Sequence, residues 1–185
     1  MRSLVVVVLL HVLTLGARAA EWRTIFDGKT LNGWQATSDA NWRVENGAIV
    51  VDSGAAGFLL HENTYRNYEL TIEFKAAKGA NSGVFLSTKR GKLKLTEDCY
   101  ELNIAPPDNP FPTGSLVART KVEGAGETDS WRRFDVRVAD GHVTVRLDGR
   151  PVVDYRSRPA NGDRLGLQLN QGRVAFRNIR VRKLP

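Results

Sequence analysis

Carboxylate and amide side chains recur at alternate positions in several apolar stretches of this sequence, and they are its best candidates for chemistry. Side chains two residues apart in a strand point to the same face of a sheet. On a concave sheet such faces would line a groove suited to a neutral polyhydroxyl ligand. For any single residue, a solvated strand face is the simpler alternative. The pairs are Glu69 with Glu73, Glu101 with Asn103, and Gln168 with Asn170.

Glu101 and Asn103 stand out because irregular segments flank them on both sides. The segment 88–98 is rich in lysine and arginine, and the segment 105–114 contains four prolines, which cannot join a central strand. Long loops on a rigid sandwich commonly carry binding residues. We therefore expect ligand chemistry at this strand before the others.

Three further residues are candidates near such a groove. Arg119 would supply a guanidinium to balance the carboxylates. Phe111 lies on the proline-rich loop and would be an exposed aromatic platform for a sugar ring. His61 ends an apolar strand, and the pattern leaves two roles open for it: a groove residue, or a surface histidine at a strand end.

Several classes of active site are excluded. The chain has no Gly-x-Ser-x-Gly elbow, glycine-rich phosphate loop, dinucleotide fingerprint or His-Glu-x-x-His motif. Cys99 is the only cysteine, which excludes an intramolecular disulfide and leaves too few ligands for a structural zinc site. Its position beside a strand predicts burial. Trp34, Trp42 and Trp131 lie near strand starts and are predicted to be core residues rather than sugar platforms.

The elements that position these residues are strands. Apolar residues follow a period of two almost throughout, no segment shows helical periodicity, and Asp-Gly and Asn-Gly turn signals separate the strands. This pattern predicts an all-β sandwich or barrel of antiparallel strands. After residue 130 we expect a meander, with strands at 131–139, 142–147, 150–155, 164–169 and 173–183.

The last expected strand contains a break in phase. Val174 and Phe176 share one face, whereas Ile179 and Val181 are displaced by one residue. This slip predicts a β-bulge near 177–178. The alternative is that one strand ends there and another begins.

Residues 1–19 have the features of a secretory signal peptide. Arg2 precedes an apolar run over 4–15, and the small-x-small pattern follows at 17–19. The run is short for a membrane span. We therefore expect cleavage after Ala19, export to the periplasm or the cell exterior, and no membrane span afterwards; an uncleaved anchor is the alternative. Residues 20–185 are predicted to form one domain.

The chain is basic, with 27 lysines and arginines against 20 acids and a formal net charge of +7. These basic residues are scattered along strands without a run of five, which favours interleaved surface charge over polyanion binding. We expect no nucleic-acid partner. The sequence does not define an oligomeric state.

Short motifs are spread in order over nearly the whole of residues 20–185. They lie at 26–34 (FDGKTLNGW), 42–49, 68–75 (YELTIEFK), 81–86 (NSGVFL), 100–104 (YELNI), 113–116, 166–169 and 174–180. Together they resemble the 3-keto-disaccharide hydrolase family. The resemblance implies a concanavalin A-like fold, a two-sheet antiparallel jelly-roll sandwich whose concave sheet is the ligand face.

The resemblance also implies the substrate, a glycoside oxidised to a ketone at sugar carbon 3. The ketone makes the C2 proton acidic, so a carboxylate could remove it, and the enolate could expel the C1 oxygen before water completes hydrolysis. An enolate needs positive charge from a cation or a guanidinium. The matching positions are Glu101 as base or metal ligand, Arg119 as electrostatic partner, and Asn103, Glu73 and Gln168 orienting hydroxyls. The participation of a divalent cation is left open, and no organic cofactor is expected.

Two positions of the expected ligand face depart from the family pattern. Asn170 stands where the family commonly has a histidine, and Ser87 where it often has an arginine. Two alternatives to catalysis are therefore kept, since one fold hosts many functions. One is a non-catalytic carbohydrate-binding module, and the other is an interaction protein of the cell envelope that uses the basic surface.

Overall fold

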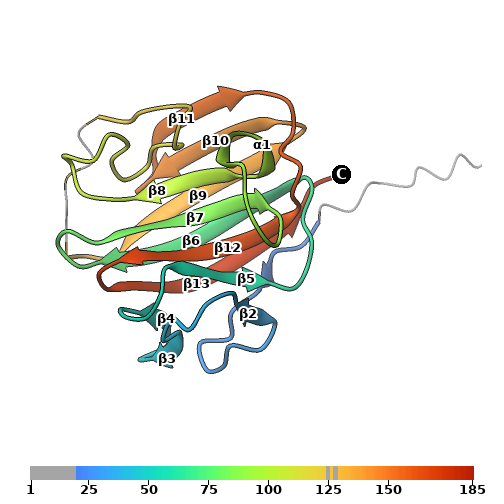
Figure 1. The fold of residues 1–185 in the computed structure, drawn as a ribbon. Helices are drawn as coiled ribbons and strands as arrows, with labels where there is room; N and C mark the ends of the chain where they lie inside the picture. Colours follow the sequence, from blue (N-terminus) through green and yellow to red (C-terminus); the bar gives the residue numbers. More distant parts are fainter. Residues whose placement is uncertain (1–19, 124–125, 127–128) are drawn as a thin grey trace, which may run out of the picture.

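The protein is a sandwich of two antiparallel β-sheets with one short helix, seen in a computed structural model that describes residues 20–123, 126 and 129–185 (Figure 1). The signal peptide predicted over 1–19 lies outside the described residues. Within the part of the chain that the structure describes, no helix is long and apolar enough to cross a membrane. The all-β architecture predicted from the alternating pattern and the two-sheet sandwich implied by the family resemblance are both confirmed.

The large sheet has eight strands. They are β1 (Arg23–Thr24), β3 (Arg43–Glu45), β4 (Ala48–Val51), β6 (Tyr68–Ala76), β9 (Arg132–Ala139), β10 (His142–Leu147), β11 (Arg150–Arg156) and β13 (Val174–Lys183). Their order is β11-β10-β9-β6-β13-β4-β3, and β1 pairs with the second half of β13.

The small sheet has five strands. They are β2 (Trp34–Ala36), β5 (Gly57–His61), β7 (Asn81–Thr88), β8 (Tyr100–Ile104) and β12 (Arg164–Gln171). Their order is β2-β5-β12-β7-β8, so β8 is an edge strand. The helix α1 (Leu95–Asp98) lies in the lysine-rich connection between β7 and β8.

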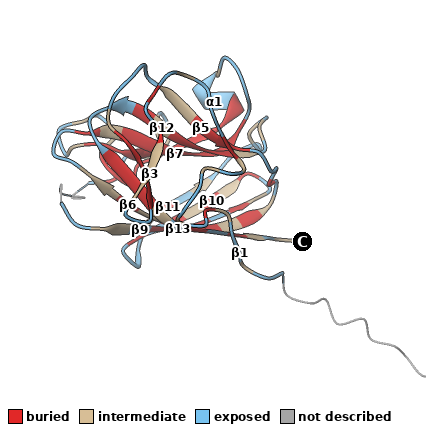
Figure 2. Cartoon of the chain, turned by 90° about the horizontal axis from the view of Figure 1, so that it is seen from below, coloured by how far each residue is buried: buried red, intermediate tan, exposed pale blue. Residues whose placement is uncertain are grey.

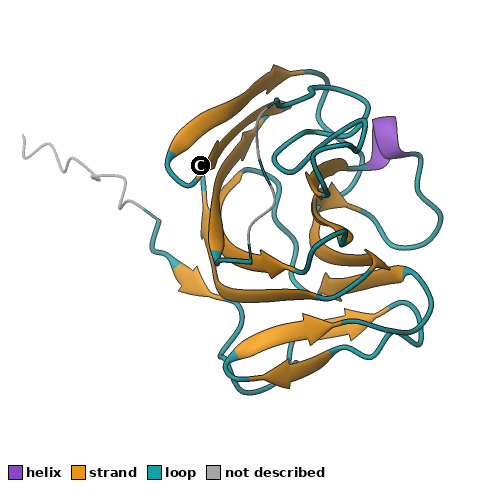
Figure 3. Cartoon of the chain, turned by 90° about the vertical axis from the view of Figure 1, so that its left-hand side faces the viewer, coloured by secondary structure: helices purple, strands orange, loops and turns teal. Residues whose placement is uncertain are grey.

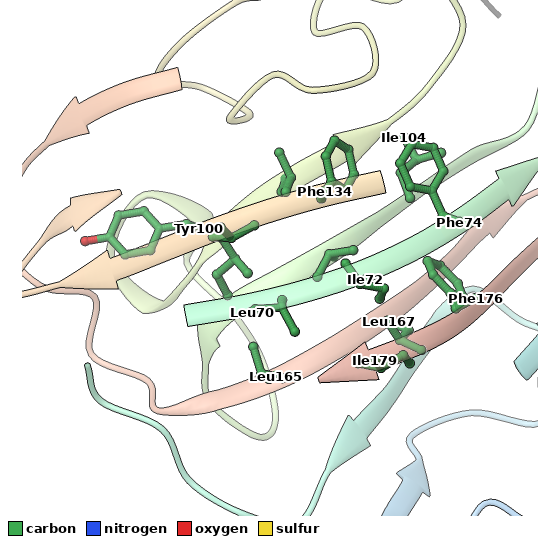
Figure 4. Packing of buried hydrophobic residues seen from close by; sticks show 14 of the residues in the cluster. Leu70, Ile72, Phe74, Tyr100, Ile104, Phe134, Leu165, Leu167, Phe176 and Ile179 are labelled. Carbon is green, nitrogen blue, oxygen red and sulfur yellow. The ribbon is translucent and has the colours of Figure 1, made fainter. Parts of the chain in front are cut away.

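The core fills the space between the two layers, which Figure 3 shows from the side. Leu70, Ile72 and Phe74 of β6 face Leu165 and Leu167 of β12 across this space (Figure 4). On β6 the outward neighbours are polar and only partly buried, so buried and intermediate residues alternate, whereas on β12 the outward Gly166 is buried as well (Figure 2). Burial of one face of each strand is the main driving force for this architecture.

Two of the three tryptophans are core residues as predicted. Trp34 and Trp42 are at most 9% exposed and join the main core. Trp131 differs: it is half-buried on the outer face of the large sheet, with the guanidinium of Arg177 at 3.9 Å from its ring. Cys99 is fully buried, as expected, and burial raises the pKa of its thiol to about 12.

The expected strand bounds after residue 130 agree with the structure to within two residues, but the expected meander is wrong. Only β9, β10 and β11 are successive neighbours. β12 crosses to the small sheet between β5 and β7, and β13 returns to the large sheet between β6 and β4. Alternation determines which face of a strand is buried, but it does not identify the strand's neighbours.

The β-bulge predicted in the last strand is confirmed. The register of β13 against β6 shifts between Arg177 and Arg180, and Asn178 has a positive φ of 52°. The extra residue lets both Phe176 and Ile179 reach the core, where each is at most 1% exposed. Glu73 of β6 accepts hydrogen bonds there from Arg177 Nε at 2.7 Å and Asn178 Nδ2 at 2.9 Å.

Phe134→Ala should lower the free energy of unfolding by about 3–5 kcal/mol, because it removes a fully buried ring that stacks on Phe74 at 4.5 Å. Urea denaturation followed by tryptophan fluorescence measures this loss. Arg137→Ala is the matched control on the same strand, where the side chain is exposed and the expected change is within about 0.5 kcal/mol. Equal losses in both variants would contradict this account of the core.

Candidate functional site

The outer face of the small sheet carries two rows of side chains that cross all or most of its strands. Residues directly opposite one another in neighbouring strands share a face. By register, the first row is Gln35, Leu60, Gly166, Phe85 and Glu101. The second row is Phe58, Gln168, Gly83 and Asn103. Both rows end in polar groups on the edge strand β8.

Two glycines lie in the middle of these rows. A Cβ at Gly83 would be 3.5 Å from both Gln168 Oε1 and Glu101 Cγ, and 3.2 Å from the Leu102 carbonyl oxygen. A Cβ at Gly166 would be 2.8 Å from Leu60 Cδ2. The missing side chain at Gly83 therefore lets the two polar groups from β8 and β12 approach each other. Glycine inside a strand often marks such a close approach.

Glu101 is the only carboxylate in these two rows, and it is 8% exposed. Burial raises the pKa of its carboxyl above the ordinary glutamate value, opposed by a hydrogen bond from Gln168 and by the charge of Arg119. Loss of hydration disfavours the charged form of an acid. Glu101 is therefore a stronger base than an exposed glutamate would be.

Arg119 is held at the edge of this site by the chain around α1. Its Nη2 donates to the carbonyl oxygens of Leu95 at 2.9 Å and Cys99 at 2.8 Å, and its guanidinium carbon lies 4.8 Å from the Tyr100 ring. Its charge acts on both Glu101 and Cys99. The side chain is thus positioned by backbone and aromatic contacts rather than by an ion pair with Glu101.

The segment that holds Arg119 is in turn fixed by Asp98, which is 2% exposed. The Asp98 carboxylate accepts from Lys89 Nζ at 2.8 Å, from the Lys94 backbone N–H at 2.8 Å and from Asn161 Nδ2 at 3.2 Å. These donors, Lys89 first, lower the pKa of Asp98 to about 2. Asp98 therefore ties the lysine-rich connection to the loop after β11 and sets the carbonyl groups that bind Arg119.

The site holds unpaired polar atoms. Among the described residues, four buried side-chain nitrogen or oxygen atoms have no hydrogen-bond partner, and three are Asn103 Oδ1, Gln168 Oε1 and Arg119 Nη1. Asn103 donates through Nδ2 to the Phe111 carbonyl oxygen, so its Oδ1 is the free end. A buried group without a partner costs about 1–3 kcal/mol. The two free acceptors, Asn103 Oδ1 and Gln168 Oε1, lie on the same face as the Glu101 carboxylate and mark a place that a polar ligand would complete.

The structure brings together four of the predicted site residues: Glu101, Asn103, Arg119 and Gln168. Phe111 joins them through its backbone carbonyl, while its side chain is half-buried rather than the exposed platform expected. Among the described residues there is no group of three or more histidine, cysteine or acidic side chains that could hold a metal. One carboxylate beside a guanidinium is a poor donor set for a hard divalent cation.

Glu73 is not brought to this site. It lies on the outer face of the large sheet, where it pairs with Arg177 at 2.7 Å, and Glu69 pairs with Arg182 on the same face. The expectation of one shared groove was wrong for these two glutamates, because β6 and β8 belong to different sheets. The polar faces of two packed sheets point in opposite directions.

His61 is also elsewhere. It faces inward at the end of β5, where its ring centroid lies 4.9 Å from that of Trp34 in an edge-on arrangement. Its Nδ1 accepts a hydrogen bond from the Asn63 backbone N–H at 3.1 Å. Burial lowers the pKa of its imidazole. It lines a cleft of about 1080 Å³ that also includes Asn32 and Tyr65 and does not reach Glu101.

Ser87 and Asn170, the two departures from the family pattern, also lie outside the two rows of side chains on the small sheet. Ser87 is buried with a positive φ of 49° and faces Tyr68, whose hydroxyl is 3.5 Å away. A register shift of β7 against β12 near this residue turns it inward. Asn170 is exposed near the end of β12. Neither residue contributes to the polar cluster around Glu101.

Sequence reasoning missed the role of Asp98 and the apolar part of the outer face. The consecutive run of Phe58, Leu59 and Leu60 was a usable signal, since an uninterrupted apolar strand is buried on both faces. Phe58 and Phe85 indeed meet on the outer face with ring centroids 4.6 Å apart. The glycines within β7 and β12 were a second signal of close approach.

A sequence profile described as the 3-keto-alpha-glucoside-1,2-lyase-like domain matches residues 21–182. A 3-keto-disaccharide hydrolase from Bacteroides thetaiotaomicron is 36% identical over 85 residues, which are 40% of this chain and 29% of that protein. The match thus spans less than a third of the relative's length.

Two solved structures share the fold. A candidate glycosyl hydrolase from Parabacteroides distasonis ATCC 8503 has a TM-score of 0.77 at 20% identity, over 89% of this chain and 94% of that one. The carbohydrate-binding module CBM66 from Bacillus subtilis has a TM-score of 0.68 at 12% identity, over 82% of this chain and 96% of that one. These likenesses confirm the predicted sandwich class.

Glu101→Gln should raise thermal stability at pH 7 and leave it nearly unchanged at pH 4. The folded pKa of Glu101 lies above its unfolded value, so the folded protein loses stability as pH rises through that interval. The amide has the same shape and no charge to desolvate. Melting temperatures of both proteins across pH 4–8 test this, and a variant less stable than the parent at pH 7 would count against it.

Asp98→Asn should show the opposite sign. The pKa of Asp98 is lowered on folding, so its contribution is present above the ordinary aspartate pKa and is lost as pH falls toward 2. The variant should therefore be less stable than the parent at pH 7, with the difference shrinking in acid. The same pH series measures it, and a pH-independent difference would show that Asp98 acts by packing alone.

Proposed function

This chain belongs to the family of 3-keto-alpha-glucoside-1,2-lyase-like domains, and from this premise we propose that it is a carbohydrate-active protein that cleaves glycosides carrying a ketone at carbon 3. The name of the Bacteroides relative, 3-keto-disaccharide hydrolase, supports this substrate class. The observation that carries the proposal is the cluster around Glu101, where two of the four unpaired buried polar atoms of the described chain, Asn103 Oδ1 and Gln168 Oε1, share a face with one buried carboxylate on which the charge of Arg119 acts.

Glu101 is the proposed base. In its ionised form it takes the proton from C2, and the electron pair of the C2–H bond forms an enolate with the ketone at C3. As the C1–O bond breaks, the enolate re-forms the ketone at C3, a double bond forms between C1 and C2, and the departing oxygen takes up a proton from solvent. Water then adds across this double bond: its hydroxyl bonds to C1, its other proton goes to solvent, and Glu101 returns its proton to C2, so that the net reaction is hydrolysis. The raised pKa of Glu101 supports this role, because it brings the carboxylate closer in basicity to its task.

The unpaired atoms supply recognition and charge stabilisation in this proposal. Arg119 Nη1 donates to the enolate oxygen, where a fixed donor near developing charge lowers the barrier. Asn103 Oδ1 and Gln168 Oε1 accept hydrogen bonds from neighbouring hydroxyls. Phe58 is half-buried beside Gln168 and offers apolar surface to a sugar ring. No step is routed through a metal ion, since the donor set does not fit one.

A second candidate is sugar binding without cleavage. Glu101 is the single carboxylate of the cluster, so no second acid stands ready to protonate the leaving oxygen. The likeness in fold to a carbohydrate-binding module supports this alternative. The two candidates share the same site and differ only in turnover.

The test is to incubate the full-length protein with a 3-keto-disaccharide and measure the released sugar. Glu101→Gln should lower the rate by about 10²–10⁴-fold while substrate binding persists, because the amide keeps the shape and loses the base. The rate of the parent should fall as pH drops through the raised pKa of Glu101. Glu73→Gln is the matched control, a carboxylate of the other sheet, and should leave the rate unchanged.

Three outcomes separate the candidates. Turnover that depends on Glu101 supports the hydrolase. Binding that is lost in Asn103→Ala, with no turnover by the parent, establishes the binding module instead. Turnover that survives in Glu101→Gln, or that is lost in Glu73→Gln, would overturn the site.

A further inference from the structure

The outer face of the large sheet is strongly basic. Outward positions on β6, β9, β10, β11 and β13 follow from the register, because each alternates with a core residue. Eight are basic: Lys75, Arg133, Arg137, Arg146, Arg156, Arg177, Arg180 and Arg182. Four are acidic: Glu69, Glu73, Asp135 and Asp154. This face therefore carries an excess of four positive charges, against +7 for the whole chain.

Each acid on this face already has a partner on the same face. Glu73 pairs with Arg177 at 2.7 Å, and Asp154 lies 2.8 Å from His142 Nε2. The other two pairs are Glu69 with Arg182 and Asp135 with Arg133. Three of the four acids are thus paired with arginines of the same face, and Asp154 hydrogen-bonds to a histidine, so the basic surplus falls on other residues.

Five basic residues have no partner among these acids. Lys75 pairs with Asp129 outside the set, and four arginines remain: Arg137, Arg146, Arg156 and Arg180. All four are exposed, and among the described residues none forms an ion pair. They stand on four strands, three of which are the adjacent β9, β10 and β11. By register no two of them are directly opposite, so the four arginines form an open array spread over the face, with the paired acids between them. Guanidinium groups bind carboxylate and sulfate in a two-pronged geometry.

We propose that this array, Arg137, Arg146, Arg156 and Arg180, is a binding surface for an acidic polysaccharide. Charge complementarity requires a polyanion. Leu95, 39% exposed, is the one large apolar residue of the described chain that counts as exposed, and it lies in α1 away from this face, so insertion into a lipid surface has no anchor here. Nucleic-acid bases have no free ring to stack on at Trp22 or Trp131, because arginine guanidinium groups already lie over both rings.

The choice of a glycan among polyanions rests on the proposed function. The array and the Glu101 cluster lie on the outer faces of different sheets, so one polymer could be held on the array while another portion reaches the cluster. If the proposed substrate is part of a polymer, such tethering would raise its local concentration at the cluster. Loss of the array should leave cleavage of a small 3-keto-disaccharide unchanged. The two proposals can therefore fail separately: binding of the polymer tests the array, and cleavage of the disaccharide tests the Glu101 cluster.

The test compares two variants with equal change in net charge. The array variant carries Arg137→Gln, Arg146→Gln, Arg156→Gln and Arg180→Gln. The control variant carries Arg66→Gln, Lys78→Gln, Lys92→Gln and Lys121→Gln, four exposed residues without ion pairs, all in connections between strands. Affinity for polygalacturonate is measured at 50 and 150 mM sodium chloride, with dextran as the neutral polymer and duplex DNA and phosphatidylglycerol vesicles as other anions. Thermal unfolding checks that both variants fold.

The parent should bind polygalacturonate more tightly than DNA or vesicles, and should not bind dextran. The array variant should lose at least about tenfold in affinity, and the control variant less than about twofold, since specific contacts and not net charge hold the polymer. Equal losses in the two variants would show a non-specific charge effect and overturn the proposal. Tighter binding of DNA or vesicles than of polygalacturonate would overturn the choice of partner, and no binding at all would overturn the surface.

Discussion

Face-to-face burial of two sheets is the constraint on which the rest of this structure depends. Each strand must turn alternate side chains inward, because only that face can leave water. The same requirement turns the remaining side chains outward at a regular spacing. On β8, burial of Tyr100, Leu102 and Ile104 is what places Glu101 and Asn103 side by side. The polar cluster is in this sense a consequence of the core.

The two buried carboxylates of the described chain, Asp98 and Glu101, have pKa values shifted in opposite directions. Asp98 receives three donors, so its charge is stabilised and its pKa falls to about 2. Glu101 lies three residues further along the chain, on β8, and burial raises the pKa of its carboxyl. The first is satisfied and structural, since it holds the carbonyl groups that bind Arg119. The second is left reactive, with unpaired atoms of Asn103 and Gln168 around it.

The outer faces of the two sheets are chemically distinct. That of the small sheet is largely buried, with Phe85 and Leu60 below 4% exposure beside the polar cluster. That of the large sheet is a lattice of charged side chains, in which every glutamate or aspartate is paired and several arginines are not. A sandwich can carry two such different outer faces because its sheets pack on one core while their outer faces do not contact each other.

Much of this protein is determined by local sequence. The strand bounds, the buried face of each strand, the bulge at 177–178, the burial of Cys99 and the pairing of Glu101 with Asn103 on one face all follow from period two and its interruptions. Tertiary structure alone decided which strands are neighbours. It joined Gln168 to Glu101, sent Glu73 to the opposite face, turned His61 inward and built the Asp98 anchor. The reason is that alternation acts between residues two apart, whereas strand pairing is chosen by contacts far apart in sequence.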